Sequence, residues 1–446
     1  MKKLWQTEAG LDSAVEAYTV GNDPELDARL LPYEVCGSLA HAAGLVKAGI
    51  LSKHDHEGLR RVLRRVARQN GAFKITRAQE DIHTAIEQAL GPIGLKVHAG
   101  RSRNDQVQVD LRLYLKDTLG RLMELSCAAA AAWEEFGRRH DGAVMPGYTH
   151  LQRAMPTTVG HWAASHAEAL LEGVRALEFA YNEVDACPLG SAAGFGVALP
   201  LDRPYVAHLL GFSRVQRNTL RVQSSRPRLE AAVVSALALV ARDIGTLAWD
   251  LSLFTSAEFG FFSLDRAFCT GSSLMPQKRN PDVVELTRAR AAMFPGWLSQ
   301  IMAIGHHSSG YHRDYQLTKG PLMAAVDCAG QMLDMTCRLP GAISVDEKRC
   351  ASAVTKDMLA THETLSLVKN GVPFRTAYRQ IAGGARKAET ALEPAGRVEL
   401  PSYLGAPGNP GWSEIARERK AIQKKLLARR KLLHTAWSRL RERPLR

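Results

Sequence analysis

Apolar residues at helical spacing, sustained over unusually long segments, constrain the fold of this chain most. Over residues 111–136 the apolar side chains follow one another at steps of three or four, and the same spacing recurs over 170–181 and 229–251. A period of 3.6 residues places such side chains on one face of an α-helix. Helices of this length bury their apolar faces against one another in a bundle. The sequence therefore predicts an all-α fold with a long central helix bundle.

Prolines mark the expected helix ends within this bundle. Pro227 suits the first turn of the 229–251 helix, because the N–H groups of a first turn have no acceptor within the helix and the one that proline lacks is not missed. We expect a further helix over 282–304, kinked near Pro295, and another over 322–338 that Pro340 ends. No set of alternating strands is visible in the sequence.

The pattern divides the chain into three predicted domains. Residues 1–104 form a mostly helical N-terminal domain, and 105–353 form the central long-helix bundle. Residues 354–446 form a small C-terminal helical domain that ends in a basic tail.

Composition excludes several classes of protein. Of the 446 residues, 46% are hydrophobic and 23% charged, which is typical of globular proteins and unlike disordered or fibrous chains. No apolar run is long enough to cross a bilayer, and no apolar segment of the secretory type follows the basic start of the chain. The 7 cysteines include no CxxC pair, which predicts reduced thiols rather than disulfides or a zinc site. We therefore expect a cytoplasmic protein with no membrane partner.

The net charge of +13 is concentrated in the last 36 residues, which carry 12 Lys/Arg and 3 Asp/Glu. Leu426, Leu427, Leu432 and Leu433 lie between these basic residues and predict a basic amphipathic helix. A solvated helix face is the ordinary explanation of such a tail, and a nucleic-acid contact is the alternative. A modest positive field also attracts anionic substrates.

Four polar segments punctuated by glycine or proline interrupt the helices and concentrate groups that bind carboxylates and move protons. They are HAGRSRNDQ (98–106), MPGYTHLQ (145–152), TGSSLMPQKRNPD (270–282) and YHRDYQLTK (311–319). Taken singly, each has a structural explanation: the first is a helix N-cap, His150 is a lone histidine and the third is a loop. Taken together on a rigid helical scaffold, they predict a binding and proton-transfer site.

Other chemistries fit the sequence poorly. There is no Walker-type phosphate loop, no GxGxxG after a strand, no HExxH and no GxSxG elbow. The histidine clusters His54-Asp55-His56 and His306-His307 lack the helical spacing of metal ligands, so no metal site is expected. What remains is proton abstraction followed by elimination on a polyanionic substrate.

The same segments resemble a known family. Residues 271–280, GSSLMPQKRN, resemble the GSSxMPxKxN loop of the fumarase/aspartase superfamily. Within it, HAGRSRNDQ (98–106), EDIH (80–83), PGYTHLQ (146–152), GVPFR (371–375) and the start Lys3-Leu4-Trp5 are similar to segments of argininosuccinate lyases, in the same order along nearly the whole chain.

This resemblance implies an activity and an assembly. The activity is reversible β-elimination of argininosuccinate to arginine and fumarate, the last step of arginine biosynthesis, without a cofactor. The assembly is a homotetramer around a shared multi-helix core, in which each active site is shared by three subunits.

The resemblance also assigns roles to individual residues. Ser272 is implied as the base, His150 as the general acid or its relay, oriented by Glu285, and Lys278 as a stabiliser of the developing charge. Lys278 and the backbone N–H groups near Gly271 and Ser273 are expected to favour a serine alkoxide. The choice of Ser272 over Ser273 depends on the family motif alone. The implied substrate-binding residues are His83, Ser102, Arg103, Asn104, Thr149, Gln152, Asn280, Tyr311, Gln316 and Lys319.

Some positions depart from the family pattern. The family's Tyr-Asn-Lys-Asp reads Tyr311-His312-Arg313-Asp314 here, and its Asn-x-Ser near the N-terminus reads Gly21-Asn22-Asp23. These departures leave open a sister lyase that releases fumarate from another succinyl-amine or from aspartate. A catalytically silent, crystallin-like homologue is the second alternative, and nucleic-acid binding through the basic tail is the third.

Overall fold

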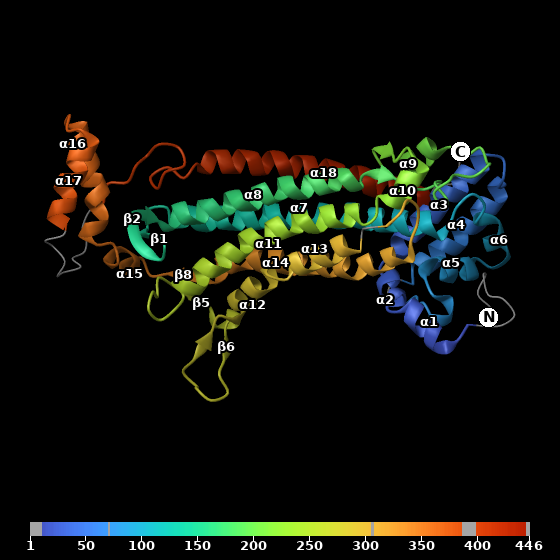
Figure 1. Ribbon diagram of the computed structural model, residues 1–446, viewed down its shortest axis with the longest axis horizontal. Helices are drawn as coiled ribbons and strands as arrows, with labels where there is room; N and C mark the ends of the chain where they lie inside the picture. The colour runs from blue at the N-terminus through green and yellow to red at the C-terminus, as the bar shows by residue number, and fades with distance from the viewer. Residues whose placement is uncertain (1–10, 70–71, 305–306, 386–397, 443–446) are drawn as a thin grey trace.

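The computed structural model describes residues 11–69, 72–304, 307–385 and 398–442, and it confirms the predicted all-α bundle. Four long helices lie side by side along the molecule (Figure 1). They are α7 (Arg103–Arg139), α8 (Val159–Val184), α11 (Arg228–Phe254) and α14 (Lys319–Ala342). Their apolar faces form one continuous core, in which Trp133, Phe136 and Leu113 are fully buried.

The predicted 282–304 helix is two helices in the structure. α12 (Asp282–Ala291) and α13 (Phe294–Ala303) both pack against α11. The break lies at Ala292–Met293, and Pro295 occupies the first turn of α13, where a missing N–H donor is tolerated.

The prediction that Pro340 ends its helix is wrong, because α14 continues to Ala342 with Pro340 inside it. Proline removes the N–H that would bond the carbonyl four residues earlier, which here belongs to Thr336. The indole Nε1 of Trp133 donates to that Thr336 carbonyl at 3.0 Å. A tertiary hydrogen bond from α7 therefore replaces the bond that Pro340 cannot make.

A cluster of shorter helices covers the end of the bundle at which α7 begins. Helix α3 (Leu31–Lys47) belongs to this cluster and packs against α7. The cluster has its own apolar core, in which Leu39, Leu59 and Ile86 are buried. The other elements of this end are α1 (Ser13–Val20), α2 (Asp23–Ala28), α4 (Lys53–Ala67), η1 (Arg77–Gln79), α5 (Ile82–Leu90), η2 (Gly91–Ile93), α6 (Gly94–Val97), α9 (Arg203–Leu209), α10 (Thr219–Ser224) and η4 (Arg313–Thr318).

Short strand pairs, which were not predicted, connect the long helices. β1 (Val144–Thr149) and β2 (Gln152–Thr158) form an antiparallel hairpin between α7 and α8. β6 (Thr270–Gly271) and β7 (Arg279–Asn280) form the base of a second hairpin that projects from the bundle just before α12 (Figure 1). The remaining pairs are β3 (Ala186–Cys187) with β4 (Arg214–Val215) and β5 (Phe262–Leu264) with β8 (Ile343–Val345), and η3 (Arg266–Phe268) precedes β6. Strands this short carry too few residues to show an alternating pattern.

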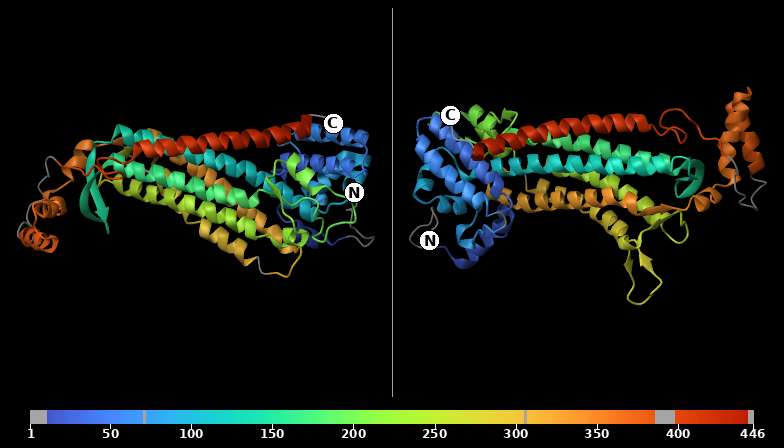
Figure 2. Two further views of the ribbon diagram at one scale, coloured as in Figure 1. Left: turned by 90° about the horizontal axis from the view of Figure 1, so that it is seen from above. Right: turned by 180° about the vertical axis from the view of Figure 1, so that it is seen from behind.

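The C-terminal part of the chain leaves the bundle and then returns to it. After α15 (Glu347–Ser352) and η5 (Lys356–Leu359), the helices α16 (Ala360–Lys369) and α17 (Phe374–Ala385) stand apart at the far end (Figure 2). The last helix, α18 (Trp412–Glu442), runs back along α7 and α8. Gly137 of α7 permits this packing, because a Cβ there would lie 2.3 Å from the Trp412 ring.

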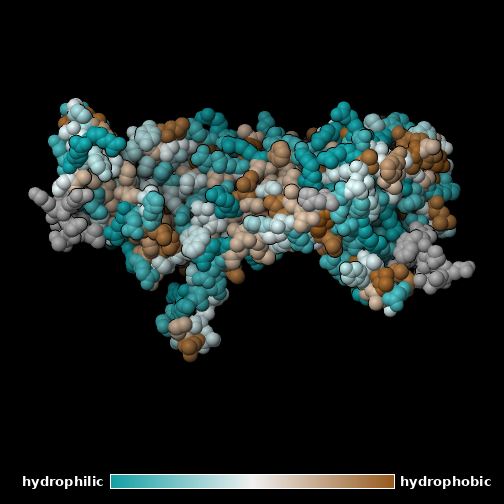
Figure 3. All heavy atoms as spheres, viewed as in Figure 1, coloured by the Kyte–Doolittle hydropathy of each residue, from teal (hydrophilic) through white to brown (hydrophobic). Residues whose placement is uncertain are grey.

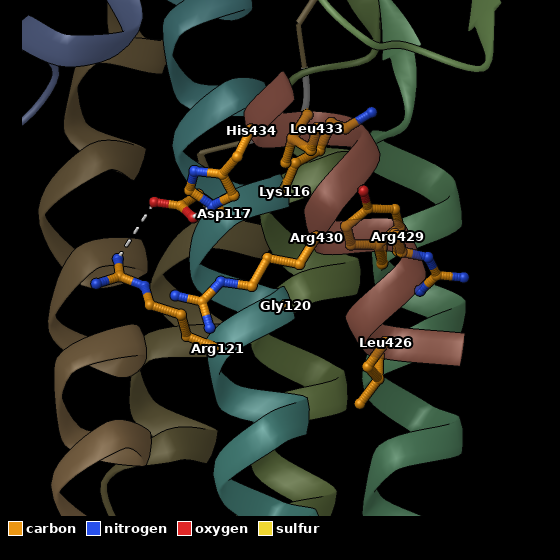
Figure 4. A pocket seen from close by; sticks show the side chains of 10 residues that line it. Lys116, Asp117, Gly120, Arg121, Leu426, Arg429, Arg430, Leu433 and His434 are labelled. Atoms are coloured by element: carbon orange, nitrogen blue, oxygen red, sulfur yellow. Dashed lines mark ion pairs between the residues drawn. The ribbon is translucent and has the colours of Figure 1, made fainter. Parts of the chain in front are cut away.

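The basic tail is the amphipathic helix that the sequence predicts, and much of its charge is neutralised. Its Arg419, Arg429 and Arg430 pair with Glu134, Glu178 and Glu124 of α7 and α8. Figure 4 shows the small hollow between these helices, where Arg121 pairs with Asp117 and the cations of α18 lie above Gly120. Ion pairing with the bundle therefore accounts for these three cations without a nucleic acid.

Two further observations concern the class of protein. Helix α11 is long and apolar enough to cross a bilayer by composition, but 61% of its most apolar 18-residue window is buried in the fold, as in the core helix of a globular protein. All seven cysteines are free thiols, and five of them are buried.

Candidate active site

A cleft of about 190 Å³ opens where the N-terminal helices meet the start of α7 and the start of α14. Six of the residues predicted to bind substrate line it: His83, Arg103, Asn104, Tyr311, Gln316 and Lys319. They come from α5, α7 and the 311–319 segment, which lie far apart in sequence. A seventh predicted residue, Ser102, is the N-cap of α7 and forms a capping box with Asp105 at the edge of this region.

The cations of the cleft are already paired with carboxylates. Lys319 is 2% exposed, and its ammonium donates to Asp23 at 3.1 Å and to Asp27. Burial opposes the charged ammonium, but Asp27 and Asp23 outweigh burial and raise the pKa of Lys319. Burial likewise raises the pKa of Asp23, against the effect of Lys319. The two carboxylates therefore stabilise the charged form of Lys319.

Arg103 and Arg313 reach the same acidic segment. The guanidinium of Arg103 lies 3.1 Å from Asp81 and 3.5 Å from Glu80, and it donates to Thr84. Arg313 pairs with Glu80 at 2.7 Å and donates to the Thr19 carbonyl. A cleft lined by acids and bases in similar number suits a ligand that carries charges of both signs.

Gln316 and Arg313 also fasten the N-terminal helices to the cleft. The Gln316 side-chain amide donates to the carbonyls of Thr19 and Val20 at 3.0 and 3.3 Å. Of these two residues, only Arg313 departs from the family pattern, within the 311–314 segment. Both residues hold the end of α1 against the cleft.

The serine loop lies elsewhere, on the exposed hairpin between β6 and β7. The Oγ of Ser272 accepts hydrogen bonds from the backbone N–H groups of Leu274 and Met275 at 3.3 and 3.0 Å. N–H donors aimed at a hydroxyl oxygen favour its anionic form. The donors are thus Leu274 and Met275, rather than groups near Gly271 and Ser273 as the sequence led us to expect.

The other predicted residues on and near this hairpin make no hydrogen bond to the Ser272 side chain among the described residues. Asn280 closes the base of the hairpin by donating to the Gly271 carbonyl at 3.4 Å. Lys278 is exposed, and Glu285 is exposed on α12 just below the hairpin. Within the described residues, no ion pair or side-chain hydrogen bond engages Lys278 or Glu285.

His150 occupies the turn of the other hairpin. It and Leu151 have positive φ angles of 56° and 59°, which form the tight turn that joins β1 to β2. Thr149 and Gln152 flank the turn as directly paired residues, and both are exposed. No hydrogen bond or ion pair holds the His150 side chain in the part of the chain that the structure describes.

One chain therefore presents the predicted site residues in three separate places. The cleft lies at the N-terminal end of α7, whereas the His150 hairpin follows the C-terminal end of that helix (Figure 1). A helix of 37 residues is about 55 Å long at the usual rise per residue. Among the described residues, no hydrogen bond or ion pair joins His150 to Glu285, and the hairpins that carry His150 and Ser272 are separate projections of the chain (Figure 1).

Several cleft residues were not predicted from the sequence. They are Asp23, Asp27, Glu80, Asp81, Arg226 and Arg313. A signal was present for the first two, because their spacing of four residues places both carboxylates on one face of a helix. Arg226 gave no signal, since it only precedes a long apolar helix. Lys3-Leu4-Trp5, used in the resemblance, lies outside the described residues.

Two groups of side chains have donor atoms close enough to consider a cation. Glu34, His83 and Asp110 form a buried group beside the cleft, and His307, His312 and Asp314 form an exposed one. The second includes one member of the His306-His307 cluster, whose His306 lies outside the described residues. In this second group His312 already bonds Ser308, and the stacked rings of His307 and His312 are 5.0 Å apart.

Comparison with known proteins identifies the family of this chain. Residues 12–296 match the family model described as Lyase. The chain is 45% identical over 425 residues to the argininosuccinate lyase of Sorangium cellulosum, an alignment that covers 93% of this chain and 98% of that protein. It is 37% identical to the argininosuccinate lyase of Thermotoga neapolitana, with 85% of this chain and 98% of that protein covered.

Solved structures support the fold. The crystal structure of EDDS lyase in complex with formate has a TM-score of 0.72 at 23% identity, and it covers 97% of this chain and 93% of that one. A class II fumarase from Schistosoma mansoni has a TM-score of 0.72 at 14% identity, with 84% and 88% covered.

Proposed function

The chain belongs to the argininosuccinate lyase family within the fumarase/aspartase superfamily, and on that premise we propose that it cleaves argininosuccinate at a site completed by several subunits. As a member of this family it is a carbon–nitrogen lyase, and its reaction yields arginine and fumarate. The observation that carries the proposal is the convergence of six predicted binding residues on one cleft, while the predicted acid and base project from the same chain on separate hairpins.

In this mechanism Ser272 removes the proton from the carbon next to a substrate carboxylate. The N–H groups of Leu274 and Met275 on its Oγ lower the cost of the alkoxide that this step requires. Lys278 and Asn280 stabilise the negative charge that then builds on the carboxylate. His150, oriented by Glu285 of another subunit, protonates the departing guanidinium nitrogen.

The cleft binds the substrate. Argininosuccinate carries three carboxylates and two cationic groups, so it matches a surface of interleaved acids and bases. Arg103 and Asn104 serve the carboxylates, with Ser102, Thr149 and Gln152 as further donors. Tyr311, Gln316 and Lys319 serve the opposite end of the substrate, and His83 supports the site.

A homotetramer would complete this site. The hydrophobic residues Leu239, Trp249, Leu286, Met293 and Met302 are all about half exposed on α11, on α12 and α13, and in the turn between these two. Figure 3 shows hydrophobic surface along the middle of the molecule, over α11 and α13. Apolar surface of this kind is typical of an oligomer interface. We infer that copies of the chain pack through this face and bring foreign hairpins to each cleft.

Fumarate release, followed by its ultraviolet absorbance, tests the substrate. We expect release from argininosuccinate and little from adenylosuccinate, aspartate or malate under the same conditions. Release from one of the other compounds, with none from argininosuccinate, would assign the chain to a sister lyase. The free thiols fit the cytoplasmic setting that we infer for this activity.

Mixing two inactive variants tests the sharing of the site. Arg103→Ala damages the cleft and Ser272→Ala damages the hairpin, so a mixed oligomer contains some sites with both groups intact. We expect activity to return when the two proteins are unfolded and refolded together, and to stay absent when either is refolded alone. Failure to recover any activity, with tetramers formed, would contradict a site built from different chains.

A further inference from the structure

A buried group of polar side chains lies directly behind the cleft, between α3, α5 and α7. It consists of Glu34, His83 and Asp110, which are 1%, 6% and 0% exposed. The Nδ1 of His83 lies 3.0 Å from Glu34 Oε2 and 3.7 Å from Asp110 Oδ2. Ser38 donates to the other oxygen of Glu34, and Arg101 donates to Ser38 at 2.8 Å.

The outer nitrogen of His83 is left without a partner. Its Nε2 is buried, and within the described residues it makes no hydrogen bond. Buried polar atoms in native proteins nearly always have a partner, which a protein group, a water or a ligand supplies. Because His83 is one of the residues that line the cleft, a ligand bound there is the natural acceptor.

The charge states of the three groups are set by one another. Burial raises the pKa of Glu34, but the adjacent His83 outweighs burial and lowers this pKa to about 2. Burial and the negative charge of Glu34 both raise the pKa of Asp110 well above its usual value. Burial lowers the pKa of His83, but Glu34 reverses this and raises it. These directions favour a carboxylate at Glu34, a carboxylic acid at Asp110 and an imidazolium at His83.

Other charges around His83 act in both directions. Asp81 on its own helix segment and Asp27 of α2 favour the imidazolium. Burial lowers the pKa of His98, just before α7, and the charges of Arg101, Arg103 and His83 lower it further. Glu34 is the carboxylate with the dominant effect, since it is both hydrogen-bonded to His83 and fully buried with it.

We propose that Glu34 and a protonated Asp110 are positioning residues that hold His83 as an imidazolium, whose Nε2–H donates to a carboxylate of the substrate in the cleft. The inference depends on the proposed function and deepens it. Its reason is a contrast within the cleft: Lys319, Arg103 and Arg313 already contact carboxylates of the protein. The Nε2–H of His83 has no acceptor among the described residues. This charged donor is therefore available for a hydrogen bond to the substrate.

The test is the pH dependence of fumarate binding, measured by calorimetry on the intact oligomer between pH 6 and 9. Wild-type affinity should fall as the pH rises past the titration of His83. Glu34→Gln removes the charge that sustains the imidazolium, so we expect the midpoint of this fall to move down by at least about one pH unit, a tenfold change in proton affinity. Glu34→Asp, which keeps the charge, should restore most of the shift.

Two further variants make the comparison specific. Asp110→Asn imitates the protonated acid, so its midpoint should remain at the wild-type value even if overall affinity changes. Glu134→Gln, which removes a buried carboxylate of the same helix at a distance from the cleft, controls for a general loss of buried charge. A midpoint that Glu34→Gln leaves unmoved, or that Asp110→Asn moves equally, would overturn the assignment.

A second readout separates this inference from the proposed function. The titration of His83 is followed in the ligand-free protein by NMR of labelled histidine, with His83→Asn identifying its signal. If argininosuccinate is not cleaved but His83 still titrates above an ordinary histidine, and does so in a Glu34-dependent way, the lyase proposal fails and the buried group stands. If cleavage occurs and His83 titrates normally, the buried group has been misassigned.

Discussion

The two ends of α7 differ in how their polar residues are held. At its N-terminal end, the side chains of the cleft are buried or half-buried and tied into ion pairs, as Lys319 is to Asp23 and Asp27. Beyond its C-terminal end, His150 occupies an exposed turn, and on the other hairpin the side chains of Ser272 and Lys278 contact little besides their own loop. The cleft side chains find their polar partners within the chain, whereas the side chains of the two hairpins find few.

This difference separates binding from chemistry. A rigid, paired cleft can recognise a charged ligand before any assembly occurs, because its donors already have fixed positions. A base and an acid left in water cannot work efficiently, since water weakens the electrostatic stabilisation that the reaction requires. In the assembly that we propose, the chain builds most of the binding half alone, and a neighbouring subunit encloses the reactive half.

The largest expected effect concerns the exposed hairpin. Ser272→Ala removes the proposed base and should lower kcat by about 10²–10⁴-fold, while leaving fumarate affinity close to normal. Steady-state rates and calorimetry measure the two quantities. Ser273→Ala is the matched control and should retain most activity, because no described side-chain hydrogen bond gives it the role of Ser272. Equal losses in both variants would remove the distinction between the neighbouring serines.

The next effect concerns stability at the cleft. Lys319→Met leaves Asp23 and Asp27 buried without their cation, and we expect about 3–5 kcal/mol to be lost from the free energy of unfolding. Urea denaturation at neutral pH measures it. Lys47→Met, which breaks the exposed pair with Asp202, should cost less than about 1 kcal/mol. Similar losses in the two variants would show that the cleft is no more tightly built than the surface.

A smaller effect depends on pH. Asp105 is fully buried and accepts backbone N–H groups from Gly190 and Ala192 at 3.0 and 2.7 Å. Burial raises its pKa to about 6, so between pH 4 and 6 the folded chain binds a proton that the unfolded chain has released. Stability from this group is therefore greatest at low pH and falls as the pH rises through 6.

Asp105→Asn should remove that fall, which we expect to be worth about 1–2 kcal/mol between pH 4.5 and 7.5. Comparing urea denaturation of the variant and the wild type at the two pH values isolates it from other titrating groups. A wild-type curve that does not fall relative to that of the variant over this range would mean that Asp105 is ionised throughout.

The smallest effect lies on the outside of the bundle. Arg430→Ala breaks an exposed ion pair with Glu124, and we expect a change below about 1 kcal/mol that disappears at high salt. Trp412→Ala on the same helix offers the contrast, since its ring packs on Gly137 and its loss should cost several times more. A dominant effect of Arg430 would mean that charge, rather than packing, docks α18.

Most of the fold was predictable, because a helical period over many turns is a strong signal. The long helices and the amphipathic tail follow from it directly. Pro340 was misjudged because the bond that replaces the lost one comes from Trp133, more than 200 residues away, and no local pattern reports such a contact. The strand pairs were missed because they are too short to have a period.

The site was predictable in its residues more than in its arrangement. The motifs identified six lining residues of the cleft, because family motifs preserve residue types in order. They did not indicate that Gln316 and Arg313 would be engaged with the Thr19 backbone, or that Lys319 would be enclosed by Asp23 and Asp27. Sequence order carries no information about which carboxylate each cation meets. The acid and base remain predictions, because no contact among the described residues joins His150 to Glu285 or to Ser272.

In the assembly that we propose, α7 acts as a ruler between reaction centres. The first turn of this helix lines one cleft, and its other end leads into the hairpin that carries His150 to a different cleft. The length of the helix therefore sets the spacing of neighbouring reaction centres. Removing a few turns from its middle would preserve every motif of the sequence. The shortened protein would still bind its ligand, yet it would deliver each histidine to the wrong place.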